Sequence, residues 1–392
     1  MRIPLSSPDI TENDIEAVVG VLRTPDLSLG PKLPEFEQAF AEYVGVPHGV
    51  ALSSGTAGLQ LGLQALDIGE GDEVILPSFT FIAVANAILQ QRAIPVFADI
   101  DPVTLNMQPD SLQSVITPRS RAIMVVHTFG YPANLDSILN IARKHRLHVI
   151  EDACEAIGAE YDGQKIGAFG DLGVFSFYPN KPITTGEGGV VVTRDVTLAR
   201  TMRALRNQGR MDNEGWLQHS LLGYNYRLPE MSCALGISQL KRINDILTRR
   251  EAVASCYGEI LKGYPFITPP PMSPANSRVC WFAFVVRLPG QFTQGDRDQV
   301  TRALTAAGIG CRPYFPPIHL QPLYSGYARR SLPVTEDVAV RTLALPFFNK
   351  LREDQIREVC RVLGEATQLA AERKKDFPRT STDGLSPSHN RR

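Results

Sequence analysis

A single lysine, Lys181, stands between an apolar run and a glycine-rich loop. The run covers residues 175–180, the loop residues 184–189, and a second apolar run follows at residues 190–192. This pattern predicts a strand that ends at the lysine, a loop, and a second strand. Apolar surroundings favour the neutral amine, which is the nucleophile that a Schiff base requires. Taken by itself, the pattern belongs more often to a lysine in a surface loop.

A second motif, SSGTAG at residues 53–58, precedes an apolar helical pattern at residues 59–63. A Ser/Gly/Thr turn at the start of a helix presents free N–H groups, a hydroxyl and the positive end of the helix dipole. Together these groups suit a phosphate. An ordinary helix cap has the same composition, so the motif alone permits either interpretation.

Asp152 ends the apolar pattern of residues 149–152. A buried aspartate at the end of a strand needs a cationic partner. A protonated pyridine nitrogen is one such partner, and its charge makes the ring an electron sink. A capping aspartate is the commoner alternative.

Two further segments combine aromatic and polar residues. Residues 78–81 follow an apolar run and offer Phe81 as a face for a planar ring, although such a side chain more often packs in a core. Residues 223–231 form a loop and helix cap in which Asn225 and Arg227 could reach anions. Together the motifs fit one chemistry, that of pyridoxal phosphate (PLP).

The elements that would position these residues are β-branched runs between amphipathic segments, over about residues 50–195. Near-continuous apolar runs predict a largely parallel sheet with helices on both faces. We expect its strands to include residues 73–76, 94–97, 122–126 and 147–150. Such a sheet binds its ligands at the carboxyl ends of its strands.

After about residue 240 the pattern changes to that of a second, smaller α/β domain. Its expected elements are a charged helix, a Pro-rich stretch, a strand and a helix, at residues 239–261, 265–274, 281–286 and 299–307. We therefore predict a large domain at residues 1–245 and a small C-terminal domain at 246–372. The Lys-, Arg-, Ser- and Pro-rich tail at 373–392 is expected to be disordered.

Composition excludes several classes of partner. The 392 residues include 40 Lys+Arg and 41 Asp+Glu, so the net charge of -1 gives no footprint for nucleic acid or an acidic membrane. The six cysteines have neither CxxC nor metal-ligand spacing, which predicts reduced thiols and no metal site. The N-terminus has no apolar leader, and no stretch approaches about 20 apolar residues. We expect a cytoplasmic protein.

The order of the motifs resembles that of the fold-type I PLP-dependent aminotransferases. Within them it is similar to the sugar-nucleotide aminotransferases of the DegT/DnrJ/EryC1/StrS family. The resemblance extends from about residue 3 to 369 and is carried by SSGTAGLQLGL, LPSFTFIAVANAI, VIEDACEAIGA, GDLGVFSFYPNKPITTGEGG and GYNYRLPEMSCALG. It implies the family's fold: a large, mostly parallel sheet domain with helices on both faces, and a smaller C-terminal α/β domain.

The resemblance implies two catalytic residues. Lys181 would form the Schiff base and shuttle protons, and Asp152 would hold the pyridine nitrogen. Since a dehydrating branch of the family carries histidine in place of the lysine, Lys181 argues against that chemistry. The other implied cofactor contacts are Phe81 on the ring, Gly55, Thr56, Ala57 and Ser176 on the phosphate, and Glu155, where relatives carry His, Gln or Glu.

The resemblance also implies how subunits and substrates meet. Asn225 matches the family residue that reaches the phosphate of the neighbouring subunit, so we expect a homodimer with shared active sites. Arg227 would bind the carboxylate of the amino donor. Substrate-side loops are expected at residues 24–30, with Leu29, and 310–320, with Tyr314 and His319. A histidine packed between prolines is an equally open interpretation of His319.

The sequence thus predicts PLP-dependent transamination of a nucleotide-linked keto sugar with L-glutamate, in amino-sugar biosynthesis for a surface polysaccharide or a glycosylated metabolite. The Arg-Pro-aromatic loop, Glu155 and ITTGEGG are similar to GDP-perosamine synthases, which aminate C4 of a 4-keto-6-deoxyhexose. Those enzymes tend to have glycine where Pro179 stands. The alternatives are a C3-ketosugar or aminocyclitol aminotransferase and, in another class, a non-catalytic PLP-binding regulatory protein.

Overall fold

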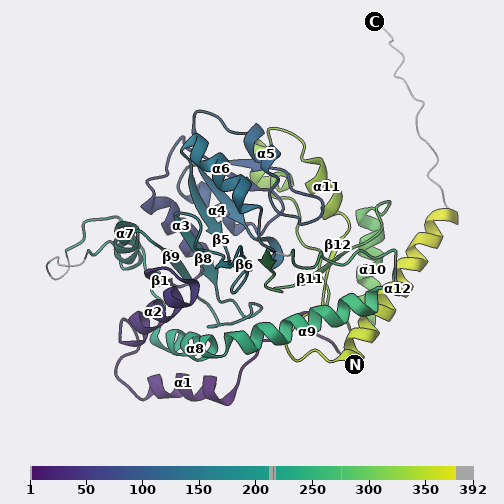
Figure 1. Ribbon diagram of the computed structural model, residues 1–392, viewed down its shortest axis with the longest axis horizontal. Helices are drawn as coiled ribbons and strands as arrows, with labels where there is room; N and C mark the ends of the chain where they lie inside the picture. Colours follow the sequence, from purple (N-terminus) through teal and green to yellow (C-terminus); the bar gives the residue numbers. More distant parts are fainter. Residues whose placement is uncertain (1, 212–214, 216–217, 275, 377–392) are drawn as a thin grey trace, which may run out of the picture.

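The computed structural model describes residues 2–211, 215, 218–274 and 276–376. Seven of its strands form one sheet that lies between two layers of helices (Figure 1). In spatial order they are β1 (His48–Leu52), β9 (Gly189–Thr193), β8 (Leu172–Ser176), β5 (His148–Asp152), β4 (Ser120–Val126), β2 (Glu73–Pro77) and β3 (Ile94–Ala98).

The large sheet is mostly parallel, which confirms the sequence prediction. The pairs β2–β3, β2–β4, β4–β5 and β5–β8 are parallel, whereas β9 runs antiparallel to its neighbours β1 and β8. Six strands therefore point the same way, and their carboxyl ends meet at one edge of the sheet.

Helices bury both faces of this sheet, so its strands are apolar on both sides. Within β9, Val190 and Val192 pack with the residues of α2, α6 and α8, while Val191 packs with those of α3, α4 and α7. The helical elements of this half are α1 (Glu12–Leu22), α2 (Lys32–Val44), α3 (Gly55–Ala65), α4 (Ala83–Gln90), α5 (Pro109–Ser114), the 3-10 turn η1 (Thr128–Gly130), α6 (Leu135–His145), α7 (Val196–Arg206) and α8 (Glu230–Lys241).

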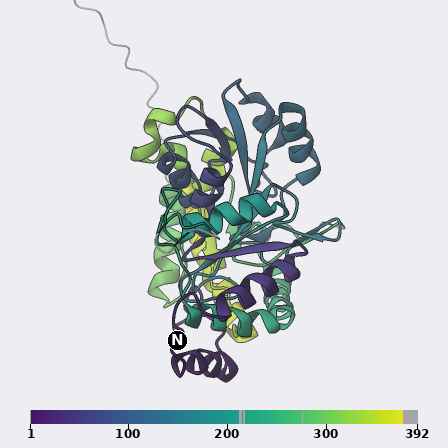
Figure 2. The same ribbon diagram turned by 90° about the vertical axis from the view of Figure 1, so that its left-hand side faces the viewer.

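The C-terminal part has a separate core around the antiparallel pair β11 (Phe284–Arg287) and β12 (Thr342–Leu345). Figure 1 shows α9 running along one side of the molecule to reach it, and Figure 2, seen from the left-hand side of that view, shows α1 in purple at the lower end. Its helical elements are α9 (Ile243–Leu261), α10 (Gln294–Ala306), η2 (Ile318–Leu320), η3 (Pro322–Tyr327), α11 (Pro333–Ala339) and α12 (Glu353–Asp376). A small third sheet consists of β10 (Ser277–Arg278), β6 (Glu160–Tyr161) and β7 (Gln164–Lys165).

The helix expected at residues 239–261 is two helices, because α8 ends at Lys241 and α9 begins at Ile243. Between them Arg242 leaves the helical conformation, with φ -113° and ψ 17°. Its guanidinium pairs with Asp9 and Asp14 of the N-terminal segment. The boundary predicted between residues 245 and 246 falls inside α9, and the division into domains stays a prediction.

Three other expected elements have different limits. The strand leading to Lys181 ends at Ser176. Soon after it the chain turns, with the N–H of Lys181 bonded to the carbonyl of Tyr178, and Pro179 has no N–H to continue the hydrogen bonds of the sheet. The strand expected at residues 281–286 begins at Phe284. The carbonyls of Trp281 and Phe282 before it accept hydrogen bonds from Arg250 instead of from a neighbouring strand. The helix expected at 299–307 begins earlier, at Gln294, behind the Thr293 capping box.

The last helix, α12, continues to Asp376, through the first residues of the expected tail. Residues 377–392, where the rest of the predicted disorder falls, lie outside the described residues. Within the described part of the chain, no helix is both long and apolar enough to cross a membrane.

A buried carboxylate fixes the connection into β8. Glu151 is fully buried and accepts hydrogen bonds from the backbone N–H groups of Gly167, Phe169 and Gly170, at 2.7–2.9 Å. His127 lies 3.2 Å from it through Nε2, and because Nδ1 accepts from the N–H of Ala133, Nε2 carries the proton that it donates to Glu151.

The substitution Glu151→Gln should lower the free energy of unfolding by about 2–4 kcal/mol, since an amide NH₂ would face backbone donors. Urea unfolding of the chain measures this. Glu259→Gln, which changes an exposed pair with Lys262, is the matched control and should change stability by less than about 0.5 kcal/mol. Equal stabilities of the two variants would contradict the role given to Glu151.

Candidate active site

Neighbouring strands deliver the candidate residues to one edge of the large sheet. Asp152 ends β5, and its register partner on β8 is Val174, two residues before Ser176. Ser176 in turn pairs with Gly189 at the start of β9. Since paired strands lie about 4.8 Å apart, Asp152 and Ser176 are close neighbours at the carboxyl edge.

The start of α3 packs directly against this edge. A Cβ added at Gly55 would lie 2.8 Å from the sulfur of Cys154 and 2.9 Å from Cβ of Ser176. Ser54 caps the helix by accepting the N–H of Ala57 at 3.1 Å. The first N–H groups of a helix have no partner inside it. Because Gly55 begins α3 and packs against Ser176, these N–H groups lie near the hydroxyl of Ser176. This cradle of amides, hydroxyl and helix dipole suits a phosphate.

The amine of Lys181 lies between a carboxylate and an aromatic ring. Its Nζ is 3.8 Å from Oε1 of Glu155, with both side chains only 12% exposed. On another side, Nζ lies 4.0 Å from the centre of the Phe282 ring. Oε2 of Glu155 accepts the backbone N–H of Phe129 at 2.8 Å. Burial raises the pKa of the Glu155 carboxyl, against the opposing effect of Lys181.

Asp152 is 7% exposed, and its Oδ1 accepts the N–H of Cys154 at 3.1 Å. Burial, with a further contribution from the Asp152 charge, raises the pKa of the Cys154 thiol well above its usual value, and Lys181 opposes this. Cys154 is therefore a neutral thiol that packs under Gly55. Asp152 keeps a carboxylate oriented by the backbone at the end of its strand.

These residues fit PLP. The cradle of α3 and Ser176 matches its phosphate, the Asp152 carboxylate its protonated pyridine nitrogen, and the Lys181 amine its aldehyde. Phe81, on the turn that follows β2, has 59% of its surface exposed, so its ring is free to cover a flat ligand.

The predicted substrate residues are placed differently from one another. The Tyr314 ring stacks on that of Phe129, with 6.2 Å between the ring centres, and burial raises the pKa of Tyr314. The stacking places Tyr314 beside the residue whose N–H binds Glu155. His319 is 2% exposed, and its ring nitrogens lie 2.6 Å from Ser78 Oγ and 3.3 Å from Glu336. That position matches the packing alternative.

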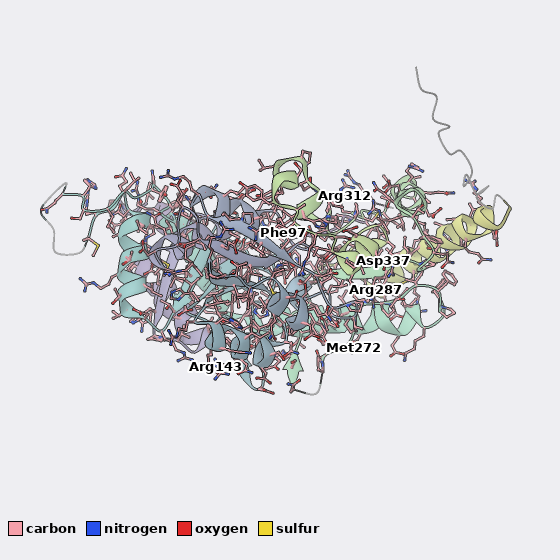
Figure 3. All side chains as sticks on the ribbon, turned by 90° about the horizontal axis from the view of Figure 1, so that it is seen from above. Phe97, Arg143, Met272, Arg287, Arg312 and Asp337 are labelled. Carbon is pink, nitrogen blue, oxygen red and sulfur yellow. The ribbon has the colours of Figure 1, made fainter. Side chains whose placement is uncertain are left out.

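Two loops carry the remaining substrate residues and stay more open. Leu29 is 49% exposed on a backbone with φ 55°. Arg312, at the start of the loop that leads to Tyr314, is exposed and is labelled in Figure 3. The roles of Leu29, Tyr314 and His319 toward a substrate stay predictions.

The segment with Asn225 and Arg227 lies beside the cradle. The carbonyl of Tyr226 accepts the N–H of Ser53, just before α3, at 2.8 Å. Arg227 is half-buried and donates to Oδ1 of Asn207 at 3.0 Å. Asn225 is exposed, which leaves it accessible to a second subunit, and its role there stays a prediction.

Sequence reasoning missed Phe129 and Phe282, which contact Glu155 and Lys181. Phe129 has φ 56°, in a turn stabilised by Gly130. The only sequence signal for it is that glycine, and Phe282 belongs to an ordinary apolar run. Each reaches the site through a tertiary contact that no local pattern encodes.

Comparison with known proteins gives a consistent result. The model of the DegT/DnrJ/EryC1/StrS aminotransferase family matches residues 8–364. The chain is 42% identical over 366 residues to a GDP-perosamine synthase of Caulobacter vibrioides, covering 93% of this chain and 98% of that protein. It is 41% identical over 345 residues to a UDP-N-acetyl-3-dehydro-α-D-glucosamine 3-aminotransferase of Acidithiobacillus ferrooxidans, covering 88% and 90%. The PLP form of the Streptococcus pneumoniae protein Spr1654 superposes with a TM-score of 0.90 at 26% identity, covering 94% and 100%.

The substitution Gly55→Ala should weaken binding of PLP about tenfold, since overpacking of this kind costs about 1–3 kcal/mol. The added methyl group would push α3 away from Ser176 and Cys154. Titration of the apo protein with PLP, followed by absorbance, measures the affinity. Gly258→Ala, in α9 with open space around the position, is the control and should bind PLP as the unchanged chain does. Unaltered affinity in Gly55→Ala would contradict the cradle.

Proposed function

The chain belongs to the DegT/DnrJ/EryC1/StrS aminotransferase family of PLP-dependent sugar aminotransferases, and we propose that it aminates a nucleotide-linked 4-keto-6-deoxyhexose. L-glutamate is the proposed amino donor. The reaction alternates between donor and acceptor at one site, and 2-oxoglutarate leaves before the keto sugar enters. The product is an amino sugar for a surface polysaccharide or a glycosylated metabolite.

The observation that carries this proposal is the buried amine of Lys181 beside Glu155, on the same sheet edge as Asp152 and the cradle of α3. When bound there, PLP supplies an electron sink for the bonding electrons of the donor α-carbon. Nζ of Lys181 takes the proton from that carbon. Asp152 would hold the protonated pyridine nitrogen, and its negative charge there would favour the electron-accepting state of the ring.

Other residues bind and orient the reactants in this proposal. Ser176 and the amides of α3 hold the phosphate, and Arg227 binds the carboxylate of the donor. With the keto sugar as second substrate, the same groups act in reverse, and Nζ returns a proton to the sugar carbon. The exposed Asn225 completes the phosphate site of a second subunit in the proposed homodimer.

The proposed position of amination is C4. It is supported by the motif similarity to GDP-perosamine synthases and by 42% identity to one of them. The nearly equal identity of 41% to an aminotransferase acting on a UDP-linked 3-dehydro sugar supports C3 amination as the second candidate. A difference of one per cent does not separate two acceptors, so the acceptor must be tested directly.

The substitution Lys181→Ala should lower transamination by at least about a thousandfold, since both the nucleophile and the proton carrier are lost. Glutamate-dependent formation of 2-oxoglutarate measures this. Lys165→Ala, which removes a partly exposed lysine paired with Glu160, should keep full activity. Substantial turnover by Lys181→Ala in a folded protein would exclude the assignment.

The acceptor is tested with enzyme first converted by glutamate to the form in which the cofactor carries the amino group. On addition of GDP-4-keto-6-deoxymannose we expect the visible absorbance of the lysine-bound cofactor to return, with an aminated sugar in the mass spectrum. A return only with the UDP-linked 3-keto sugar would favour C3 amination. No response to glutamate at all would favour the regulatory alternative.

A further inference from the structure

A short segment, residues 280–282, runs from the small domain across the edge of the active site. The N–H of Cys280 donates to the carbonyl of Gly130 at 3.0 Å. A Cβ on Gly130 would lie 1.6 Å from the carbonyl oxygen of Cys280 and 2.8 Å from that of Glu155, so the two backbones touch there. At its other end the segment sets the Phe282 ring 4.0 Å from Nζ of Lys181. The segment therefore contacts both partners of the Lys181–Glu155 pair.

A buried arginine holds the backbone of this segment. Arg250 of α9 is 3% exposed; its Nε donates to the carbonyl of Trp281 at 2.6 Å and its Nη2 to that of Phe282 at 2.8 Å. Its Nη1 donates to Oδ1 of Asn349 at 3.1 Å. The guanidinium group of arginine is planar, and its donors point in fixed directions, so Arg250 can bond two consecutive carbonyls and a third acceptor at once. The single ammonium of a lysine has no such fixed geometry.

All three acceptors of Arg250 are neutral oxygens, and no carboxylate of the described residues forms an ion pair with it. Burial lowers the pKa of Arg250 to about 10, so the group is still charged at neutral pH. Burying a charge without an ion-pair partner is costly, and the hydrogen bonds must offset the lost hydration. The structural effect of the buried Arg250 guanidinium is that it fixes the backbone of residues 281–282 through two hydrogen bonds.

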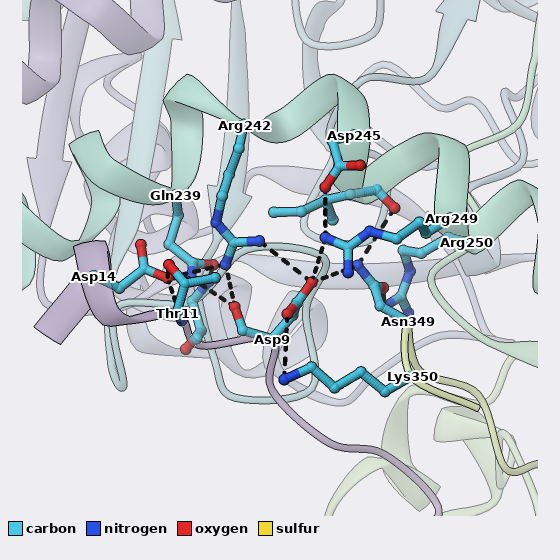
Figure 4. A network of polar contacts seen from close by, with 12 residues as sticks. Asp9, Thr11, Asp14, Gln239, Arg242, Asp245, Arg249, Arg250, Asn349 and Lys350 are labelled. Carbon is cyan, nitrogen blue, oxygen red and sulfur yellow. Dashed lines mark hydrogen bonds and ion pairs between the residues drawn. The ribbon is translucent and has the colours of Figure 1, made fainter. Parts of the chain in front are cut away.

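Arg250 is itself braced from the other side, as Figure 4 shows. Nδ2 of Asn349 donates to Asp9 at 2.9 Å, and Asp9 pairs with Arg242 at 3.3 Å and with Arg249 at 2.8 Å. These contacts join the N-terminal segment, the junction of α8 and α9, and the residues after β12. The guanidinium of Arg250 is thus anchored to three parts of the chain.

We propose that Arg250 is a positioning residue for the reaction: through the backbone of Phe282 it holds an aromatic face against Lys181. The inference rests on the proposed role of Lys181. A lysine released from the cofactor has a long flexible stem, and the ring face beside Nζ limits the positions that the end of this stem can take. The apolar ring also favours the neutral amine, which is the form that attacks the cofactor. Phe282 on one side and Glu155 on the other keep the amine facing the cofactor site, ready for the next bond or proton transfer.

The test measures the amine directly, without a sugar acceptor. Apo protein is mixed with PLP, samples are reduced with borohydride, and the modified Lys181 peptide is quantified against time. We expect Phe282→Leu, which removes the flat face beside Nζ, to slow attachment about threefold, and Phe282→Tyr, which keeps the ring, to restore the rate. Phe292→Leu, in the core around β11 and β12 but outside residues 280–282, is the matched control and should attach PLP at the unchanged rate.

Arg250→Lys keeps the charge but loses the fork, and we expect about a tenfold slower attachment, because misalignment by about 1 Å costs up to about a hundredfold. Arg357→Lys, which makes the same change in an exposed pair with Glu353 of α12, is its control and should attach PLP at the unchanged rate. If Arg250 acts through Phe282, the double variant Arg250→Lys/Phe282→Leu is no slower than the slower single variant.

The inference would be overturned if the double variant slowed attachment by the product of the two single-variant effects, because the two residues would then act independently. An unchanged attachment rate in Phe282→Leu would overturn it as well. Should Arg250→Lys fail to fold, Asn349→Ala, which removes the acceptor of Nη1 and leaves the guanidinium in place, replaces it in the same double-variant comparison with Phe282→Leu. In a single turnover with glutamate, Phe282→Leu should lower the maximal rate, while the glutamate concentration that gives half of this rate stays within about twofold. Complete failure of every variant and of the unchanged chain to attach PLP at Lys181 would instead reject the proposed function.

Discussion

The close approach of α3 to the ends of β5 and β8 is the constraint on which the site depends. Only a glycine at position 55 lets the first turn of the helix reach Ser176 and Cys154, and the antiparallel β9 meets the same place through Gly189. The anion cradle, the Asp152 carboxylate and the lysine loop are therefore set relative to one another by backbone packing.

The buried charged side chains near this edge of the sheet each have hydrogen-bond partners. Glu151 below the site is satisfied by backbone donors, and Glu155 is shared between a backbone N–H and Lys181. Where α8 meets α9, Asp9 pairs with several cations, and Arg250 binds only neutral oxygens. Isolated buried charges are costly, and each of these groups has hydrogen bonds that offset the cost.

Much of this arrangement could be predicted from the sequence. The strands were recognisable because a strand covered on both faces is apolar along its length, as in β4 and β5. The order of the motifs and their position at strand ends singled out Lys181, Asp152 and Ser176 as candidates, and their roles stay predictions. The strands before them do meet at one edge of the sheet. The break at Arg242 was not, because arginine favours helices locally and the break follows from its pairing with Asp9 and Asp14. Phe129, Phe282 and Arg250 were missed for the same reason: each acts through a contact with a distant segment.

The antiparallel direction of β9 has a consequence for how the site forms. Because β8 and β9 pair directly, with Ser176 opposite Gly189 and Phe177 bonded to Gly188, the lysine loop is closed as a hairpin within one stretch of chain. Closing a short loop costs less chain entropy than bringing together strands separated by a helix. The loop that carries Lys181 can thus acquire its shape from local contacts early in folding. The start of α3 and the Phe282 ring reach it only after the long crossovers and the C-terminal part of the chain have assembled around it.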